Sequence, residues 1–521
     1  MTKQYDNYAD LITFSRSSSG TALRPVSYGD ELVTNGTFDT DTSGWTLSSG
    51  GTHTVSSGEL TIDRDGDLAV IPYITQGIST VVGNLYLLSF EVKAGSTFSY
   101  SVSLDGVEVI TPTSVTTGTK TLTFVATETT TDVALFSRNS IASVLVLDNI
   151  SVKEVLFDQP NAPLTLFNHP AGIPRIEYDA DGNRLGLLIE ESRTNLVTYS
   201  EDFSNVAWAK VNVSVTPAST AAPDGTSNGS KLIANTASSA HFIQEAFTVS
   251  NATVYTFSIY AKQGEYSTIA IASSGGAATN QAVVNLTTGV VTGGTATTQS
   301  VGNGWWRISV PYTTNATTLT LNAYVINGTA FADRNTAGDG TSGIYIYGAQ
   351  LEAGAFPTSY IPTSGATATR AADLASIPVS AFGYNQSEGT VVVEARNTEN
   401  CDVLALIDDG STNNRIRLYE SGSNVVGLVS VNSTNVAVMV TLQSVAVDSL
   451  KSAIATKKDD FAVVANGGSV VSDTAGDMPS NLTDLQVATP EGGGANGAVH
   501  IKSIKYYPRR LTNAQLQELT T

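Results

Sequence analysis

The chain contains a single cysteine, Cys401, among 521 residues. One thiol can form neither an intrachain disulfide nor a metal site built from several cysteines, so we expect it to be packed in a core. Histidine is also scarce, and no second histidine or carboxylate lies at ligand spacing from His53, His169, His241 or His500. The sequence has no nucleophile-elbow, phosphate-loop or zinc-protease motif. These absences argue against an enzyme, and we expect none.

The sequence also lacks long apolar runs and positive charge. No stretch of ~18 apolar residues occurs, which excludes a transmembrane helix. The N-terminus has no apolar core of a signal peptide, so we expect a protein made in a cytoplasm that nothing in the chain exports. The formal net charge is −20, with only 14% charged residues. Such a surface repels nucleic-acid phosphates and anionic membranes, so neither is expected as a partner.

What the chain does contain is typical of β-structure. Threonine, serine, valine and alanine dominate, 45 glycines are spread throughout, and helix-forming residues are few. Apolar and polar residues alternate in segments such as 58–62, 87–92 and 120–125. The Asp-Gly pairs at 105–106 and 181–182 predict tight hairpins. We therefore predict an all-β chain of tandem β-sandwiches (jelly-roll-like), with one short C-terminal helix capped by Thr512 or Asn513.

Part of the sequence is repeated. Residues 31–45, 85–95 and 146–154 are echoed in the same order by residues 195–208, 254–264 and 345–353. A period this long indicates a duplicated domain rather than a solenoid. Trp45 and Trp208 are equivalent in the repeat, so we expect both to lie in a core.

These patterns predict three sandwich domains, in line with one domain per ~150 residues. The predicted order is an N-terminal attachment segment (1–28), a first sandwich (29–155), a connector (156–194), a second sandwich that repeats the first (195–363), a linker (364–377) and a third sandwich (378–521).

Acidic residues offer one candidate metal site. Asp63, Asp65 and Asp67 would share one face of a strand, and beside Gly66 their oxygens could hold Ca²⁺. The alternative is a polar turn with solvated acids, which the pattern favours. Adjacent Glu190 and Glu191 would point to opposite faces, which is wrong for a shared catalytic site. No other cofactor is expected.

Aromatic residues are the better candidates for binding. Trp305 and Trp306 follow a Gly-Asn-Gly turn, so one ring should face inward and the other outward. Tyr345 and Tyr347 would share one strand face. Exposed aromatic rings can stack on the apolar face of a sugar, which makes these four residues glycan-contact candidates. The alternative is that they pack in a core or between domains.

Several segments resemble a family of tail-fibre, appendage and minor structural proteins of tailed-bacteriophage particles. The matching segments are residues 12–22, 184–196, 199–203 and 348–362, of which 188–196 is the most specific. The resemblance covers roughly residues 1–28 and 156–375. In that family the first two segments usually lie close together, which implies that the first sandwich was inserted between them.

The individual sandwiches also resemble known modules. The two repeats look like jelly-roll carbohydrate-binding modules, which commonly open with an Asn-Gly-x-Phe…Trp pattern like that of residues 35–45. Residues 378–521 are similar to a concanavalin-like (laminin-G-like) sandwich, on the strength of residues 504–516. No sugar-contacting residue carries over, because these families use variable loops.

The resemblances imply a virion protein, made in the cytoplasm of a bacterial host, that is a structural tail, neck or head fibre subunit. Its partners would be other phage virion proteins and a host cell-surface glycan bound weakly at many sites for adsorption. A homo-oligomer is expected, a trimer by analogy with phage fibres. The alternatives are a capsid-decorating or collar protein that binds only other virion proteins and, less favoured, a polysaccharide depolymerase.

Overall fold

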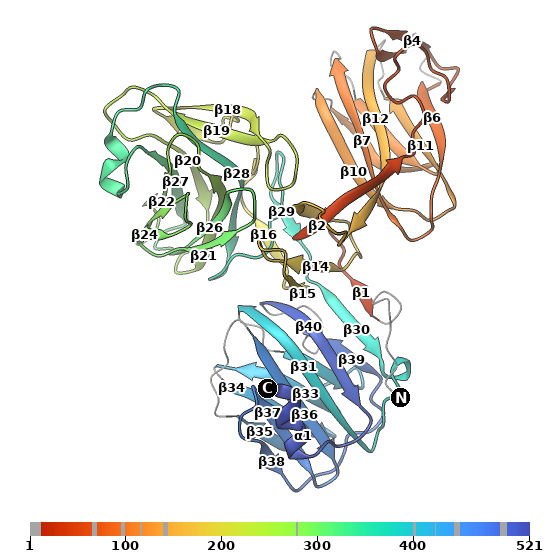
Figure 1. Cartoon of the computed structure of the whole chain (residues 1–521), viewed down its shortest axis with the longest axis vertical. Helices are drawn as coiled ribbons and strands as arrows, with labels where there is room; N and C mark the ends of the chain where they lie inside the picture. Colours follow the sequence, from red (N-terminus) through yellow and green to blue (C-terminus); the bar gives the residue numbers. More distant parts are fainter. Residues whose placement is uncertain are drawn as a thin grey trace. The chain divides into compact units, whose positions relative to one another are not determined.

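The computed structural model describes residues 12–64, 70–94, 99–114, 117–138, 144–277, 280–399, 403–422, 424–441, 449–489 and 497–521. Within them the chain is built of antiparallel sheets, as predicted, and the strands form two-layered sandwiches (Figure 1). No helix in the described part is long and apolar enough to cross a membrane.

The chain divides into two compact units. One contains residues 25–163, and the other contains residues 1–24 together with 164–521. The first unit is a single sandwich, called here the insert sandwich. The second contains the middle sandwich, which holds the second repeat, and the terminal sandwich. The chain thus leaves the second unit and returns to it.

The insert sandwich consists of two sheets. One has the order β4 (Thr52–Ser56), β5 (Glu59–Asp63), β12 (Val144–Phe157), β7 (Leu85–Ala94) and β10 (Gly118–Val125), and its strand β12 also pairs with β2 (Gly20–Glu31). The other has the order β3 (Thr46–Leu47), β6 (Tyr73–Ser79), β11 (Thr130–Ser137), β8 (Ser99–Leu104) and β9 (Val107–Ser114). Their facing sides enclose one core.

The middle sandwich has the same arrangement. One sheet has the order β18 (Val213–Thr220), β19 (Gly229–Ala234), β28 (Gly343–Ala353), β21 (Val254–Lys262), β26 (Trp305–Thr313) and β25 (Thr297–Ser300). The other has the order β17 (Ala209–Val211), β20 (Phe242–Thr248), β27 (Thr318–Ile326), β22 (Thr268–Gly275), β23 (Gln281–Asn285) and β24 (Val291–Gly293). The 3₁₀ helix η2 (Phe331–Asn335) follows β27.

The equivalent strand orders confirm that the sequence repeat is a structural repeat. Five consecutive strands of each sheet in the insert sandwich match five in the middle sandwich, position by position. The predicted core tryptophans are also equivalent: Trp45 packs 5.8 Å from Phe38, and Trp208 packs 5.3 Å from Phe203, between ring centroids. Both indoles are buried.

The terminal sandwich draws strands from three parts of the sequence. One sheet has the order β1 (Thr13–Ser15), β30 (Leu374–Pro378), β39 (Asp484–Val487), β32 (Val403–Asp408), β33 (Arg415–Ser421), β34 (Asn424–Val431) and β35 (Thr434–Val440). The other has the order β14 (Arg175–Tyr178), β15 (Arg184–Glu190), β40 (Ala498–Tyr507), β31 (Glu388–Glu399), β36 (Leu450–Lys457), β37 (Phe461–Ala465) and β38 (Val471–Asp473).

The expected attachment segment and connector therefore supply strands to a sheet. β1 pairs with β30, and β15 pairs with β40. The reason is apolar burial, because Leu187 and Ile189 of β15 lie in the same core as Val393. Shorter elements complete this unit: β13 (Leu164–His169), the β16 (Arg193–Asn195) and β29 (Ala368–Arg370) pair, and the 3₁₀ helix η3 (Val379–Ala381).

The local predictions that can be checked are confirmed. Asp105 and Gly106 join β8 to β9 with φ of 51° and 78°, the left-handed geometry of a two-residue hairpin. The final helix α1 spans Asn513–Thr520, and the Thr512 side chain accepts a hydrogen bond from the Gln515 N–H at 3.3 Å. Cys401 lies outside the described residues.

Candidate functional site

Five charged residues form a buried ionic cluster in the second unit. Arg16, Arg175 and Arg370 surround Glu190 and Asp373, and each of the five side chains is at most 3% exposed. Arg16 contacts Asp373 at 3.0 Å, and Arg175 contacts Glu190 at 2.8 Å. Because the five positions come from four separate segments, the cluster ties those segments together.

Electrostatics keep this cluster ionised. Burial alone would raise the pKa of Glu190, but Arg370 and Arg175 outweigh burial, and the pKa is held well below its usual value. The Glu190 carboxylate also accepts hydrogen bonds from the Ser359 N–H at 2.7 Å and the Ser359 hydroxyl at 2.6 Å. A carboxylate that is fully paired and shielded from solvent holds the chain segments of the cluster together and is not available for acid–base chemistry. Sequence placed Glu190 on a strand but did not identify its partners.

Two of the four predicted glycan contacts are buried. Trp305 is 1% exposed, and its indole N–H donates to the Ala221 carbonyl at 3.1 Å. Tyr347 is 2% exposed and packs 6.0 Å from Tyr260 between ring centroids. A second layer of side chains, including Leu23 and Leu166, covers this face of the sheet. Neither ring presents a face to a sugar in this arrangement, which matches the alternative of packing between segments.

The other two predicted contacts are partly exposed, and glycan contact there stays a prediction. The Trp306 indole N–H donates to the Leu286 carbonyl at 3.0 Å, and its ring lies against Gly289. Tyr345 lies 6.0 Å from the Lys231 ammonium. The structure does not bring these two rings into contact with each other or with a second ring in its described part, so they form no joint platform.

The Tyr347 hydroxyl joins two carboxylates that sequence reasoning missed. It lies 3.0 Å from an oxygen of Glu201 and 3.0 Å from an oxygen of Asp224. The Tyr360 hydroxyl also donates to Glu201 at 3.0 Å, so two phenolic protons are shared between the two carboxylates. Burial, assisted by the nearby Asp224 carboxylate, raises the pKa of Glu201.

The predicted Ca²⁺ site cannot be assembled from the described residues. Asp63 ends β5 and is half-buried, whereas Asp65 and Asp67 lie outside the described residues. In the part that is described, no group of three acidic, histidine or cysteine side chains is arranged to hold a metal ion. Of the histidines, His500 of β40 contacts Glu177 of β14 at 2.6 Å within one sheet of the terminal sandwich, a pairing that its sequence neighbours did not show.

The best-formed aromatic surface is on the outer face of the second sheet of each repeat, the face turned away from the sandwich core. In the insert sandwich, Tyr73 of β6 pairs across strands with Phe136 of β11 at 4.9 Å between ring centroids. Both rings are partly exposed. The Arg138 guanidinium lies 4.9 Å from the Phe136 ring centroid.

The middle sandwich carries the equivalent pair. Phe242 of β20 lies opposite Tyr324 of β27, with ring centroids 4.8 Å apart. Phe331 of η2 meets Tyr324 edge-on at 5.3 Å, and the Arg334 guanidinium lies 4.4 Å from the Phe331 ring centroid. These residues form a cluster separate from the core of the sandwich. Both repeats thus present an aromatic pair at equivalent strands. The arginine stacks on a ring of the pair in the insert sandwich and on the third ring, Phe331, in the middle sandwich.

A buried amide lies beside the pair in the middle sandwich. Asn322 is two residues from Tyr324 along β27, is 1% exposed, and interacts with the Tyr324 hydroxyl. The alternation of side chains along each strand predicts the sheet face on which each residue of this aromatic surface lies. Only the register between strands shows that these residues are neighbours.

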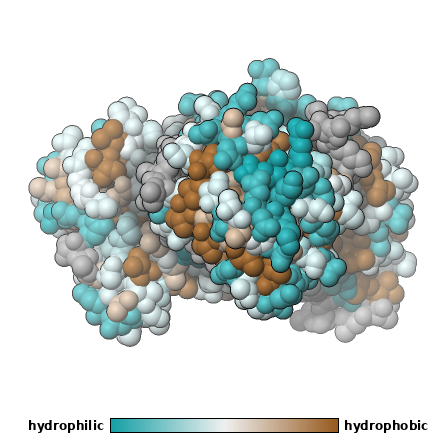
Figure 2. All heavy atoms as spheres, turned by 90° about the horizontal axis from the view of Figure 1, so that it is seen from below, coloured by the Kyte–Doolittle hydropathy of each residue, from teal (hydrophilic) through white to brown (hydrophobic). Residues whose placement is uncertain are grey.

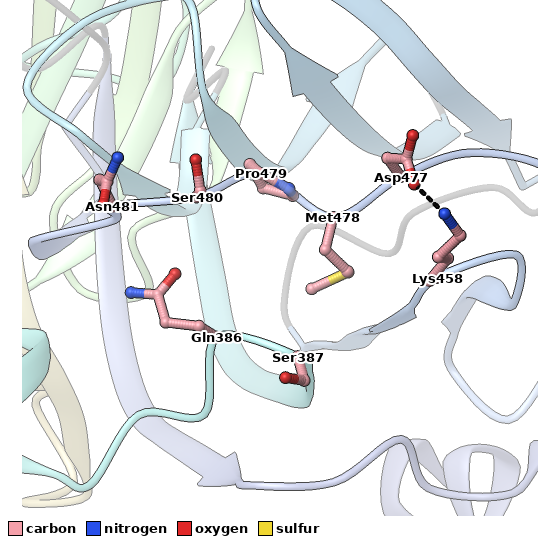
Figure 3. Close-up of a pocket in the computed structure, with 8 residues that line it drawn as sticks. All are labelled: Gln386, Ser387, Lys458, Asp477, Met478, Pro479, Ser480 and Asn481. Atoms are coloured by element: carbon pink, nitrogen blue, oxygen red, sulfur yellow. Dashed lines mark hydrogen bonds and ion pairs between the residues drawn. The ribbon is translucent and has the colours of Figure 1, made fainter.

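A polar groove of about 550 Å³ on the terminal sandwich is the second candidate surface (Figure 3). It is lined by Gln386, Ser387, Lys458, Asp477, Met478, Pro479, Ser480 and Asn481. Lys458 pairs with Asp477, as the dashed line in Figure 3 shows, and Gln386 donates to the Leu482 carbonyl at 3.1 Å. Because these polar groups are engaged within the fold, the groove offers less to a ligand than the aromatic faces.

No protein-family model matches the chain, and no curated protein matches it. Among solved structures it is similar to the N-terminal CBM22-1–CBM22-2 tandem domain of Paenibacillus barcinonensis Xyn10C, at 14% identity over 63% of this chain and 98% of that one, with a TM-score of 0.22. It is also similar to domains LG4-5 of the mouse laminin alpha1 chain, at 13% identity over 53% of this chain and 88% of that one, with a TM-score of 0.21. It is similar as well to the ANX2 ectodomain from Arabidopsis thaliana, at 10% identity over 59% of this chain and 86% of that one, with a TM-score of 0.20. TM-scores this low leave the fold and function to be argued from the chain itself.

Proposed function

We propose that this protein is a structural appendage subunit of a tailed-phage particle whose two repeated sandwiches bind host-surface glycans through their outer aromatic faces. The glycan role rests on one observation, which is that both repeats carry a cross-strand pair of aromatic rings. The pairs are Tyr73 with Phe136 and Phe242 with Tyr324. Tyr73, Phe136 and Phe242 are partly exposed, whereas Tyr324 is 8% exposed. A pyranose could therefore stack on two rings in the insert sandwich and on one in the middle sandwich. The virion role rests on the resemblance of residues 12–22 and 184–196.

Binding at each face should be weak, because a sugar on one or two partly exposed rings buries little apolar area. Two faces per chain and several chains per particle raise the effective concentration, so the assembled appendage would bind far more tightly than one site. Duplication of the sandwich serves this purpose without any change in the chemistry of a single site.

The decisive experiment measures glycan-array binding and particle adsorption with Phe136→Ala, Phe242→Ala and the double variant. We expect each single variant to weaken binding and the double variant to abolish it. Tyr419→Ala is the matched control, because Tyr419 also carries a stacked arginine, Arg417 at 4.3 Å, but no second ring beside it in the described chain. Wild-type binding by the double variant would refute the glycan role and favour a protein that binds only other virion proteins.

The homo-oligomer is part of the same proposal. β35 is the last strand of its sheet, carries no charged residue, and exposes Val438 by 51% and Val440 by 40%. One face of the molecule shows hydrophobic side chains in separate groups among hydrophilic ones (Figure 2). Uncharged edge strands readily pair with another chain. Light scattering should report a closed oligomer, a trimer by analogy, that Val438→Lys weakens.

Polysaccharide cleavage is the second candidate function, favoured by the Glu201 and Asp224 pair. Both carboxylates touch the Tyr347 hydroxyl, so they lie within the separation used by glycosidases, and burial raises the pKa of Glu201. Release of reducing sugar that Glu201→Gln abolishes would establish this activity. The binding proposal predicts no release by the wild type.

A further inference from the structure

The arginine beside each aromatic face is in a different electrostatic state in the two repeats. In the insert sandwich, Arg138 forms an ion pair with Glu108 at 2.7 Å, and its Nε donates to the Ser101 hydroxyl at 2.8 Å. The positive charge is therefore already neutralised by a side chain of the same sheet. An incoming anion would have to displace Glu108.

In the middle sandwich the corresponding charge is not neutralised. Arg334 donates through Nη1 to the Phe331 carbonyl at 3.0 Å, and it takes part in no ion pair among the described residues. The neighbouring carboxylate of Asp333 is already engaged, because it accepts the backbone N–H groups of Thr329 and Ala330, each at 2.9 Å. The guanidinium keeps hydrogen-bond donors and a full charge at the end of the aromatic face.

The groups on this face match the parts of an acidic sugar. Phe242 offers a partly exposed ring to a pyranose, and the buried ring of Tyr324 packs beside it. Arg334 suits a carboxylate or sulfate, which a planar guanidinium binds through two parallel N–H groups. Phe331 lies between the arginine and Tyr324, so the anionic group would lie at the edge of the bound sugar.

We propose, on the basis of the proposed glycan function, that the two repeats differ in specificity: the middle sandwich takes anionic glycans, and the insert sandwich takes neutral ones. The difference follows from one partner residue, Glu108, which is present beside Arg138 and has no counterpart at Arg334 within the described part of the chain.

The test uses the full chain and an array of matched glycans: sialyllactose beside lactose, and oligogalacturonate beside its carboxyl-reduced form. In a Phe136→Ala background the insert site is disabled, so the measured glycan binding comes from the middle site alone. We expect it to favour the acidic members roughly tenfold or more, the range of a charge-assisted hydrogen bond. Arg334→Gln should remove this preference while binding of neutral members persists, which shows that the site is folded. Equal binding of acidic and neutral members in the Phe136→Ala background would overturn the proposal.

A gain of binding provides the converse test, which misfolding cannot imitate. In a Phe242→Ala background, where only the insert site reports, Glu108→Gln frees Arg138 and should create a preference for the acidic members. An unchanged preference for neutral members would refute the assigned role of Glu108. If neither background binds any glycan beyond the level of the double aromatic variant, the proposed function itself fails, an outcome distinct from loss of the charge preference alone.

Discussion

Glu190→Gln should be the most destabilising conservative substitution in the buried ionic cluster. The variant keeps the shape of the side chain but removes the charge that faces Arg175 at 2.8 Å and Arg370 at 3.5 Å. Water cannot solvate these guanidinium groups in place of the lost carboxylate, since both residues are at most 1% exposed. Breaking a buried pair by removing one partner costs about 3–5 kcal/mol, because an uncompensated charge stays behind. We expect a loss of this size in the free energy of unfolding.

Urea unfolding followed by tryptophan fluorescence is a suitable assay. Trp208, Trp305 and Trp306 lie in the same unit as the cluster, so they report mainly on that unit. Glu394→Gln is the matched control, because Glu394 pairs only with the exposed Lys502 at 3.2 Å among the described ion pairs. Exposed pairs contribute about 1 kcal/mol or less.

The pH dependence gives a second measure of the same effect. Because the pKa of Glu190 is lowered on folding, its ionisation stabilises the fold above about pH 4.3, the unfolded value. That contribution is lost as the pH falls toward the lower pKa of the folded state. The difference between wild type and Glu190→Gln should therefore shrink in acid. A variant no less stable than Glu394→Gln at pH 7 would refute the view that this cluster holds the unit together.

Three further predictions concern other parts of the chain. Replacing residues 26–162 with a short Gly-Ser linker should leave the urea transition of the second unit unchanged, because the two ends of the insert sandwich are joined by a backbone hydrogen bond of 3.0 Å. Burial raises the pKa of Glu245 to about 7, so the stability of the wild type relative to Glu245→Gln should fall as the pH rises from about 4.3 to 7, measured by unfolding midpoints at pH 5 and 8. Gly289→Ala should cost about 1–3 kcal/mol, because its Cβ would come 2.3 Å from the Trp306 ring. Gly302→Ala, with a similar φ and open space around it, is the control for the backbone contribution, and equal losses would contradict the steric argument.

The fold was largely predictable, because it is encoded locally. Alternating apolar residues gave the strands, the Asp-Gly pair at 105–106 gave a hairpin, and Thr512 gave the cap of the final helix. The repeat was also visible, since the order of its segments is a property of the linear chain. Connectors were harder to assign: residues 184–190 look like a strand from sequence, but pairing with β40 depends on a partner more than 300 residues away.

The candidate site was only half predictable. Trp305 and Tyr347 are aromatic strand residues, as expected, but segments distant in sequence cover them. Tyr73 and Phe136 gave no signal of their own, because they are separated by more than 60 residues and meet only through the register of β6 with β11.

The sequence by itself determined the class of structure: one thiol, few charges of positive sign and period-two patterning lead to duplicated β-sandwiches. The tertiary structure alone decided which aromatic rings reach the surface and which charges find partners. The physical reason is that alternation along a strand specifies the face on which a side chain lies, whereas exposure and charge compensation depend on what the rest of the chain places over that face.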